Sequence, residues 1–143
     1  MKFKFFPIAL LALHALSGCT TYQIPVDSFK QQFAAVDSAA LIMVKTRGPA
    51  GDVAEYPANP IRQIQCVDKH GNRAVLTNSP SIETRITTAD GKRTIFYFDR
   101  VYLENDTLYG QRSRFVGLPK GIAVSEIVKV EVQDGGKNFR YVD

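Results

Sequence analysis

The 143-residue chain has few of the side chains on which enzymes most often rely. It contains two histidines, two cysteines and no tryptophan. His14 lies inside an apolar N-terminal run and Cys19 follows that run, so Cys66 and His70 are the only thiol and imidazole in the rest of the chain. A serine or cysteine nucleophile usually needs a base held against it, most often histidine. Only one pair of residues therefore offers this chemistry.

The spacing of Cys66 and His70 does not favour a catalytic pair. On an extended strand Cys66 shares a face with Ile64, whereas His70 falls in the Gly- and Asn-containing turn that follows. We expect Cys66 to pack as a small apolar residue and His70 to be exposed, and we predict no catalytic residue. A catalytic pair and a redox-active or intermolecular thiol are the alternatives.

The acidic residues show no metal-binding pattern. Turn acids usually accept hydrogen bonds from their own backbone, and a calcium loop needs a regular Asp-x-Asp-x-Asp spacing. Here the acids of the predicted turns occur singly, at Asp90, Asp99, Glu104, Asp106 and Asp134. We expect no metal and no cofactor. A pair of carboxylates brought together by the fold, as in glycoside hydrolases, is an open alternative because such pairs need not be close in sequence.

The one long hydrophobic run lies at the N-terminus and ends in a cysteine. Two lysines precede the apolar residues 5–16, and Leu16-Ser17-Gly18-Cys19 follows. The run is shorter than the roughly 20 residues that span a bilayer, which is typical of a secretory signal. Its ending resembles a bacterial lipoprotein signal. We predict a signal peptide over 1–18, lipidation of Cys19 and a lipidated tether over 19–24; an ordinary signal peptide with a chance cysteine is the alternative.

Charge and the residues after Cys19 bear on the partner and the location. Loss of Lys2 and Lys4 with the signal lowers the net charge by two, from +4 to +2, which does not favour nucleic acid. Thr20 is not aspartate, which in the sorting pattern of enteric lipoproteins indicates the outer membrane. No acid precedes Asp27, which favours the periplasmic face. We expect attachment to the membrane through lipid, and an envelope protein or an anionic glycolipid as a further partner.

Residues 25–143 are expected to form a single small β-rich domain that starts with a helix. Apolar residues recur at spacings of three and four over 26–36, which predicts a helix that packs on the β-domain. Asp27 and Ser28 are suitable N-terminal caps. The apolar positions are Val26, Phe29, Phe33 and Val36.

From residue 61 to the end, short apolar segments alternate with turn residues. Local strands with short turns favour antiparallel pairing, because parallel pairs need long crossovers. We predict a mainly β fold, a small antiparallel meander, roll or partly closed barrel, with one short N-terminal helix. Three details of this prediction are a long loop over 47–60, a central strand over 93–103, and a shared face for Val128, Val130 and Val132.

One predicted hairpin, residues 107–120, combines basic and aromatic side chains. A strand with one core face and one solvated face accounts for this composition. The alternative is a small contact patch for anionic headgroups, lipopolysaccharide or an acidic partner. The candidate contact residues are Tyr109, Arg112, Arg114 and Lys120.

Four segments carry a wider resemblance: the Leu-Ser-Gly-Cys motif, the Cys-Thr-Thr-Tyr-Gln-Ile-Pro stretch that starts at Cys19, residues 45–49, and the ending 127–142. In these the chain resembles small envelope lipoproteins of Bacteroidota, over most of its length after the signal. The resemblance implies an envelope location and no defined activity. Separately, residues 101–110 and 122–132 are similar in pattern to hairpins of Sm-like or SH3-like small barrels.

The sequence therefore predicts a lipid-anchored cell-envelope protein. Its domain is expected to be a non-catalytic binding or assembly module whose ligand the sequence does not identify. The alternative is a small envelope enzyme, a hydrolase that uses carboxylates.

Overall fold

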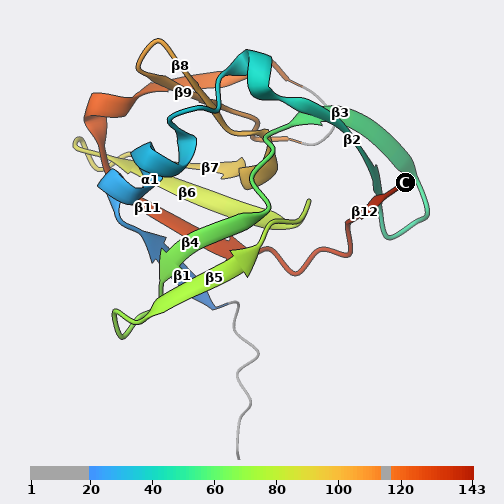
Figure 1. Cartoon of the computed structure of the whole chain (residues 1–143), viewed down its shortest axis with the longest axis horizontal. Coiled ribbons are helices and arrows are strands. Elements are labelled where there is room, and N and C mark those ends of the chain that lie inside the picture. Colours follow the sequence, from blue (N-terminus) through green and yellow to red (C-terminus); the bar gives the residue numbers. More distant parts are fainter. Residues whose placement is uncertain (1–19, 114–116) are drawn as a thin grey trace, which may run out of the picture.

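Twelve strands and one α-helix make up the part of the chain that the structure, a computed structural model, describes: residues 20–113 and 117–143 (Figure 1). The predictions for the signal 1–18, for Cys19 and for Arg114 lie outside these residues. The expected mainly β fold with antiparallel pairing and one short N-terminal helix is confirmed. Within the described residues the strands form three sheets and no closed barrel.

The largest sheet has six strands in the order β5-β4-β1-β11-β6-β7, and every neighbouring pair is antiparallel. Along β6 the buried residues alternate with partly exposed ones, so one face of the sheet meets the core and the other meets solvent. The strands are β1 (Thr21–Ile24), β4 (Gln63–Val67), β5 (Arg73–Thr77), β6 (Ile82–Thr88), β7 (Arg93–Tyr97) and β11 (Ile127–Asp134).

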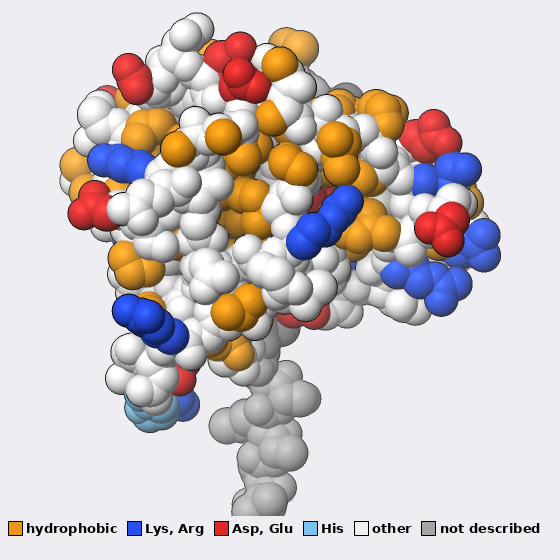
Figure 2. All heavy atoms as spheres, viewed as in Figure 1, with side chains coloured by type: hydrophobic (Ala, Val, Ile, Leu, Met, Phe, Trp, Pro, Cys, Tyr) orange, Lys and Arg blue, Asp and Glu red, His pale blue; other side chains and the backbone are white. Residues whose placement is uncertain are grey.

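The strand register defines two ends of this sheet. Gln23 pairs with Val67, so the start of β1 and the turn between β4 and β5 lie at one end, which we call the Thr21 end. The turn between β6 and β7 lies at the other end, since Thr88 pairs with Ile127 at the start of β11. We call this the Lys92 end. In Figure 1 the turn between β4 and β5 and the start of β1 both lie on the lower side of the molecule, and Figure 2 shows basic side chains on that turn.

Helix α1 (Val26–Phe33) covers the inner face of the sheet. Phe29 and Phe33, four residues apart, are both buried and lie 4.7 Å apart between ring centroids. The helix was expected over 26–36 with Asp27 and Ser28 as caps, and those two details are wrong. Pro25 is the cap residue, because its carbonyl accepts from Phe29 N at 2.9 Å, and no side chain caps the first turn.

A second sheet, in the order β10-β9-β8, closes the core on the same side as the helix. It contains β8 (Tyr102–Glu104), β9 (Thr107–Gly110) and β10 (Lys120–Ala123). Asn105 and Asp106 both have positive φ, as the two central residues of a tight hairpin turn require. Gly110 is needed because a Cβ there would lie 2.5 Å from the Phe96 ring.

A third sheet, in the order β12-β2-β3, extends beside the main sheet. It contains β2 (Ile42–Arg47), β3 (Val53–Ala58) and β12 (Arg140–Val142). The long loop expected over 47–60 is therefore wrong, because only residues 48–52 form the turn between two paired strands. Pro57 is tolerated because β3 is an edge strand, where a missing N–H breaks no ladder.

The tether expected over 19–24 is also corrected, because Thr21–Ile24 form β1. This strand pairs with β11 over all four residues and with β4 at Gln23. Ile24 is fully buried in the core. Backbone pairing on both sides of an interior strand holds these residues in the sheet, so Thr20 alone separates Cys19 from it.

Two further strand predictions fail for identifiable reasons. The central strand expected over 93–103 is interrupted by a 3-10 turn, Phe98–Arg100, and its first part, β7, is the edge of the main sheet. In β11 the register shifts between Ile127 and Lys129, so Val128 is 55% exposed while Val130 and Val132 are buried. A bulge of this kind moves one residue to the other face.

Candidate functional site

Among the described residues, four basic side chains from three segments lie near one another around the Lys92 end and the edge strand β7. Lys92 and Arg93 come from the turn between β6 and β7, Lys120 begins β10, and Arg112 follows β9. None of these four residues, which we call the distal cluster, forms an ion pair with another described residue. The Lys92 side chain lies against that of Lys120 and, with Arg112, holds the pKa of Lys120 below its usual value. Neighbouring like charges favour the uncharged form, so the cluster attracts an anion.

A groove of about 370 Å³ runs beside the cluster along the edge strand β7. Arg93 and Arg112 line it, together with Lys137, which is already paired with Glu83 at 3.3 Å. Asp90 is the nearest acid in the turn, and its Oδ1 accepts from Lys92 N at 3.0 Å. The Asp90 carboxylate is hydrogen-bonded to the backbone of its own turn. The ammonium group of Lys92 and the guanidinium group of Arg93 therefore stay available to a partner.

The structure divides the predicted contact patch. Lys120 pairs with Gly110 and Gly121 pairs with Tyr109, so Lys120 and Tyr109 lie on opposite faces of the second sheet. Tyr109 stacks on Tyr102, with ring centroids 5.3 Å apart. Arg112 and Lys120 do come together, but with Lys92 and Arg93 in place of Tyr109. Arg114 lies outside the described residues.

Sequence reasoning missed Lys92 and Arg93 because they belong to a different hairpin. The two residues were assigned to a tight turn and the start of a strand, which is correct. Their proximity to Lys120 depends on how the second sheet folds over the first. The only signal in the sequence was the number of basic residues in each predicted hairpin. That number does not show which hairpins lie side by side in the fold.

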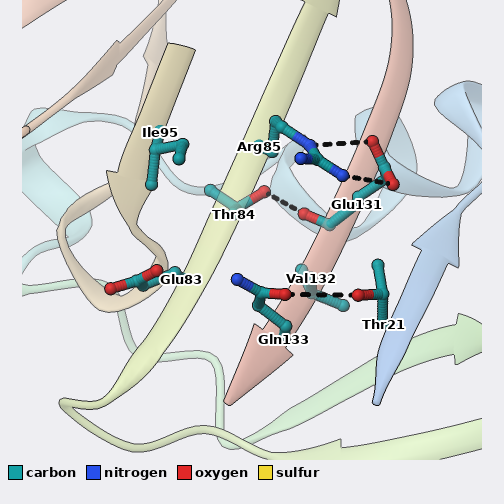
Figure 3. A pocket seen from close by; sticks show the side chains of 8 residues that line it. All are labelled: Thr21, Glu83, Thr84, Arg85, Ile95, Glu131, Val132 and Gln133. Atoms are coloured by element: carbon teal, nitrogen blue, oxygen red, sulfur yellow. Dashed lines mark hydrogen bonds and ion pairs between the residues drawn. The ribbon is translucent and has the colours of Figure 1, made fainter. Parts of the chain in front are cut away.

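A small hollow on the outer face of the main sheet contains the two carboxylates that come nearest to a hydrolase pair (Figure 3). Glu131, on β11, accepts from Arg85 Nε at 3.1 Å and from Arg85 Nη2 at 2.9 Å. Glu83 lies on the other side of β6 in this view and pairs with Lys137. The Arg85 guanidinium lowers the pKa of Glu131, whereas a general acid needs a raised one. The hollow therefore offers ion pairs, and no observation favours an acid–base pair in it.

Cys66 and His70 are placed as expected. Cys66 is 5% exposed, and its thiol lies 3.5 Å from the Ala74 carbonyl oxygen. Burial raises the pKa of this thiol, which keeps it protonated and unreactive near neutral pH. His70 is exposed in the turn between β4 and β5, and its backbone N–H donates to Asp68 Oδ1 at 2.8 Å. The structure does not bring the thiol and the imidazole into a catalytic arrangement.

Asp99 was expected to be an ordinary turn acid, but it is fully buried. Its Oδ2 accepts from the hydroxyl of Tyr56 on β3 and from that of Tyr141 on β12, the latter at 2.9 Å. Burial and the negative charge of Asp99 raise the pKa of Tyr141. Arg100 lies over the Tyr56 ring at 3.8 Å. These contacts join the third sheet to the core, so the cluster has a structural role.

Residues 20–113 and 117–143 contain neither a candidate metal site nor a helix that could span a membrane. No group of three or more His, Cys, Asp or Glu side chains is arranged to hold a metal ion. No helix in these ranges has both the length and the apolar character needed to cross a bilayer.

Comparison with known proteins identifies no relative: no family model, curated protein or solved structure matches the chain.

Proposed function

We propose that the protein is a lipid-anchored module of the cell envelope, held on the periplasmic face of the outer membrane, that binds an anionic partner without catalysis. The lipoprotein-like ending Leu16-Ser17-Gly18-Cys19 supports the anchor. The distal cluster, in which Lys92 lies against Lys120 while Arg93 and Arg112 line the groove along β7, supports the binding role and is the observation that carries it.

The short connection between anchor and domain limits how far the Thr21 end could lie from the membrane. β1 begins at Thr21, two residues after Cys19. Two residues span at most about 7 Å, so a lipid on Cys19 would hold the Thr21 end of the main sheet close to the headgroups. The distal cluster lies at the other end of the sheet and would face away from that membrane.

This orientation favours an envelope protein over a glycolipid of the same leaflet as the partner. A surface directed away from its own membrane meets proteins of the surrounding compartment first. Lysine and arginine clusters pair well with carboxylates, and arginine does so in a planar, bidentate geometry. The proposed partner therefore presents a patch of Asp and Glu side chains.

The anchor is tested by the variant Cys19→Ala. The variant is expected to incorporate no fatty acid and to stay as an uncut precursor, because lipidation precedes cleavage of such signals. Radiolabelled palmitate and the apparent mass of the protein provide the readout. Cleavage at the same site, with retention in the membrane fraction, would contradict the lipoprotein assignment.

The binding role is tested with a fluorescent hexaglutamate peptide and, separately, with vesicles that contain a phosphorylated glycolipid. Lys92→Gln combined with Lys120→Gln is expected to weaken peptide binding, and added salt is expected to weaken it further. Lys69→Gln combined with Arg73→Gln, at the other end of the sheet, removes the same charge and serves as the control. Stronger binding to the glycolipid than to the peptide would assign the cluster to a glycolipid instead.

A further inference from the structure

The turn between β4 and β5, residues 68–72, is directed toward the end of the sheet at which the lipid anchor would sit. β4 runs antiparallel to β1, and the two strands pair at Gln23 and Val67. The residues after Val67 therefore continue toward the segment that precedes β1. In Figure 1 this turn lies on the lower side, as does the start of β1, and in Figure 2 it is the lowest described part of the molecule.

This tip carries a net positive charge, because Lys69 and Arg73 outnumber its single acid, Asp68. Lys69 and Arg73 are exposed, and neither forms an ion pair with another described residue. The single acid of the tip is Asp68, whose Oδ1 accepts from His70 N at 2.8 Å and from Asn72 N at 2.9 Å. Those backbone bonds hold the carboxylate in the turn beside exposed Lys69, and exposed Arg73 follows the turn as the first residue of β5.

The backbone presents the tip as a rigid unit. β4 and β5 pair over five residues, from Gln63 with Thr77 to Val67 with Arg73. Gly71, with φ of +80°, supplies the left-handed conformation that closes the turn. Because the hairpin is paired along its length, the backbone that carries these charges keeps a fixed position relative to the rest of the sheet.

We propose that the tip of the β4–β5 hairpin, through Lys69 and Arg73, is a contact surface for the anionic headgroups of the membrane that holds Cys19. The inference rests on the proposed lipid anchor and extends it, because it adds a second contact that fixes how the domain stands on the membrane. One lipid attachment leaves the domain free to rotate. A lateral ionic contact restricts that rotation and keeps the distal cluster directed away from the bilayer.

The test couples the mature chain, residues 19–143, through the Cys19 thiol to a maleimide lipid in nanodiscs, with mass analysis to verify that buried Cys66 stays unmodified. A nitroxide-labelled headgroup lipid then broadens the amide NMR signals of residues near the surface. The signals of residues 69–72 are expected to broaden in nanodiscs with 30% phosphatidylglycerol, taken as roughly physiological in charge. The signals of residues 89–92, at the Lys92 end, are expected to stay sharp.

Two matched double variants make the test specific to charge position. Lys69→Gln with Arg73→Gln is expected to reduce the surface-bound population by about fivefold for each charge removed, because each basic residue near an anionic surface contributes to this extent. Lys92→Gln with Arg93→Gln removes the same charge from the distal cluster at the opposite end, and it is expected to leave the broadening at residues 69–72 unchanged. Nanodiscs of phosphatidylcholine alone are expected to behave like the first variant.

Three results would overturn the inference: equal broadening at residues 69–72 and 89–92, equal broadening in the two double variants, or no dependence on anionic lipid. Because the maleimide lipid replaces the natural anchor, any of them leaves the proposed lipidation of Cys19 untouched. Conversely, normal maturation of Cys19→Ala in cells would contradict the anchor and leave the nanodisc result standing.

Discussion

The two ends of the main sheet are closed by hairpin turns with similar local chemistry. At the Thr21 end, Asp68 accepts backbone hydrogen bonds and Gly71 has φ of +80°. At the Lys92 end, Asp90 accepts from a backbone N–H and Gly91 has φ of +82°. An arginine begins the next strand in both cases. The turns differ in what the chain topology places beside them.

The two turns have different neighbours in the fold, and we propose a different role for each. The turn at the Thr21 end lies on the same side as the N-terminal strand, so it would approach the membrane. The turn at the Lys92 end lies beside Lys120 and Arg112, and it gains a second source of positive charge. The local sequence of each basic turn specifies its shape. The difference between the proposed roles of the two turns comes from the tertiary fold around them.

The largest expected effect comes from moving the anchor to the other end. In a chain with Cys19→Ala and Ala89→Cys, coupling to the maleimide lipid attaches the Lys92 end to the nanodisc. Residues 89–92 are then expected to show the broadened NMR signals, and residues 69–72 to lose them. Broadening that stays at residues 69–72 after the anchor has moved would mean that the tip binds lipid independently of the anchor position.

A smaller effect is expected from the charge variants in peptide binding. Lys92→Gln with Lys120→Gln should weaken hexaglutamate binding roughly two- to thirtyfold, since each of two exposed ion pairs contributes about 0.2–1 kcal/mol. Fluorescence anisotropy at two salt concentrations measures the change. If Lys69→Gln with Arg73→Gln weakens binding as much, the two ends are equivalent and the assignment of the partner to the Lys92 end is wrong.

Features that depend on residues close together in the sequence could be predicted. Features that depend on contacts between distant segments could not. The helix, the short antiparallel strands and the turns between them follow from local periodicity and turn residues, and they are present. The buried Cys66 follows from strand alternation. Position within a sheet does not: the segment 93–103 was predicted to be a central strand because it is apolar on both faces, yet its first part, β7, is an edge of the main sheet.

The candidate site could also be predicted only in part, because its residues come from separate hairpins. Arg112 and Lys120 were identified on their own hairpin, whereas Lys92 comes from a turn twenty positions before Arg112 in the chain. The residues after Cys19 were interpreted as a tether between the lipid and the domain. Pairing with β11 and β4 overturns that interpretation, because an interior strand satisfies its backbone hydrogen bonds on both sides.

A modest effect is expected from acid on the two turns. The backbone N–H of Asn72 holds the pKa of Asp68 below the ordinary value of 3.8, and the Thr88 hydroxyl, together with the backbone N–H of Lys92, does the same for Asp90. A carboxyl with a depressed pKa stabilises the fold above pH 3.8, and this stability is lost as the pH falls through the pKa of the folded state. The difference in Tm between the wild type and Asp68→Asn, or Asp90→Asn, should therefore shrink in acid. A difference that persists at low pH would mean that the carboxylate charge is not what stabilises either turn.

The smallest expected effect concerns Cys66, which reports whether the β4–β5 hairpin stays packed. Burial raises the pKa of the thiol, so a thiol reagent should modify it slowly in the native protein and quickly after denaturation. Anchoring to anionic nanodiscs should slow the native reaction slightly, because a held hairpin opens less often. Rapid modification of the native protein would show an accessible thiol and reopen a redox role.

The central claim, that the two ends of the sheet face different surroundings, is tested most directly by photo-crosslinking in living cells. Benzoylphenylalanine replaces His70 at the Thr21 end in one strain and Ala89 at the Lys92 end in another; both positions are exposed. After irradiation, the account predicts phospholipid adducts from position 70 and protein adducts from position 89. The same adducts from both positions, or phospholipid from position 89 alone, would contradict it.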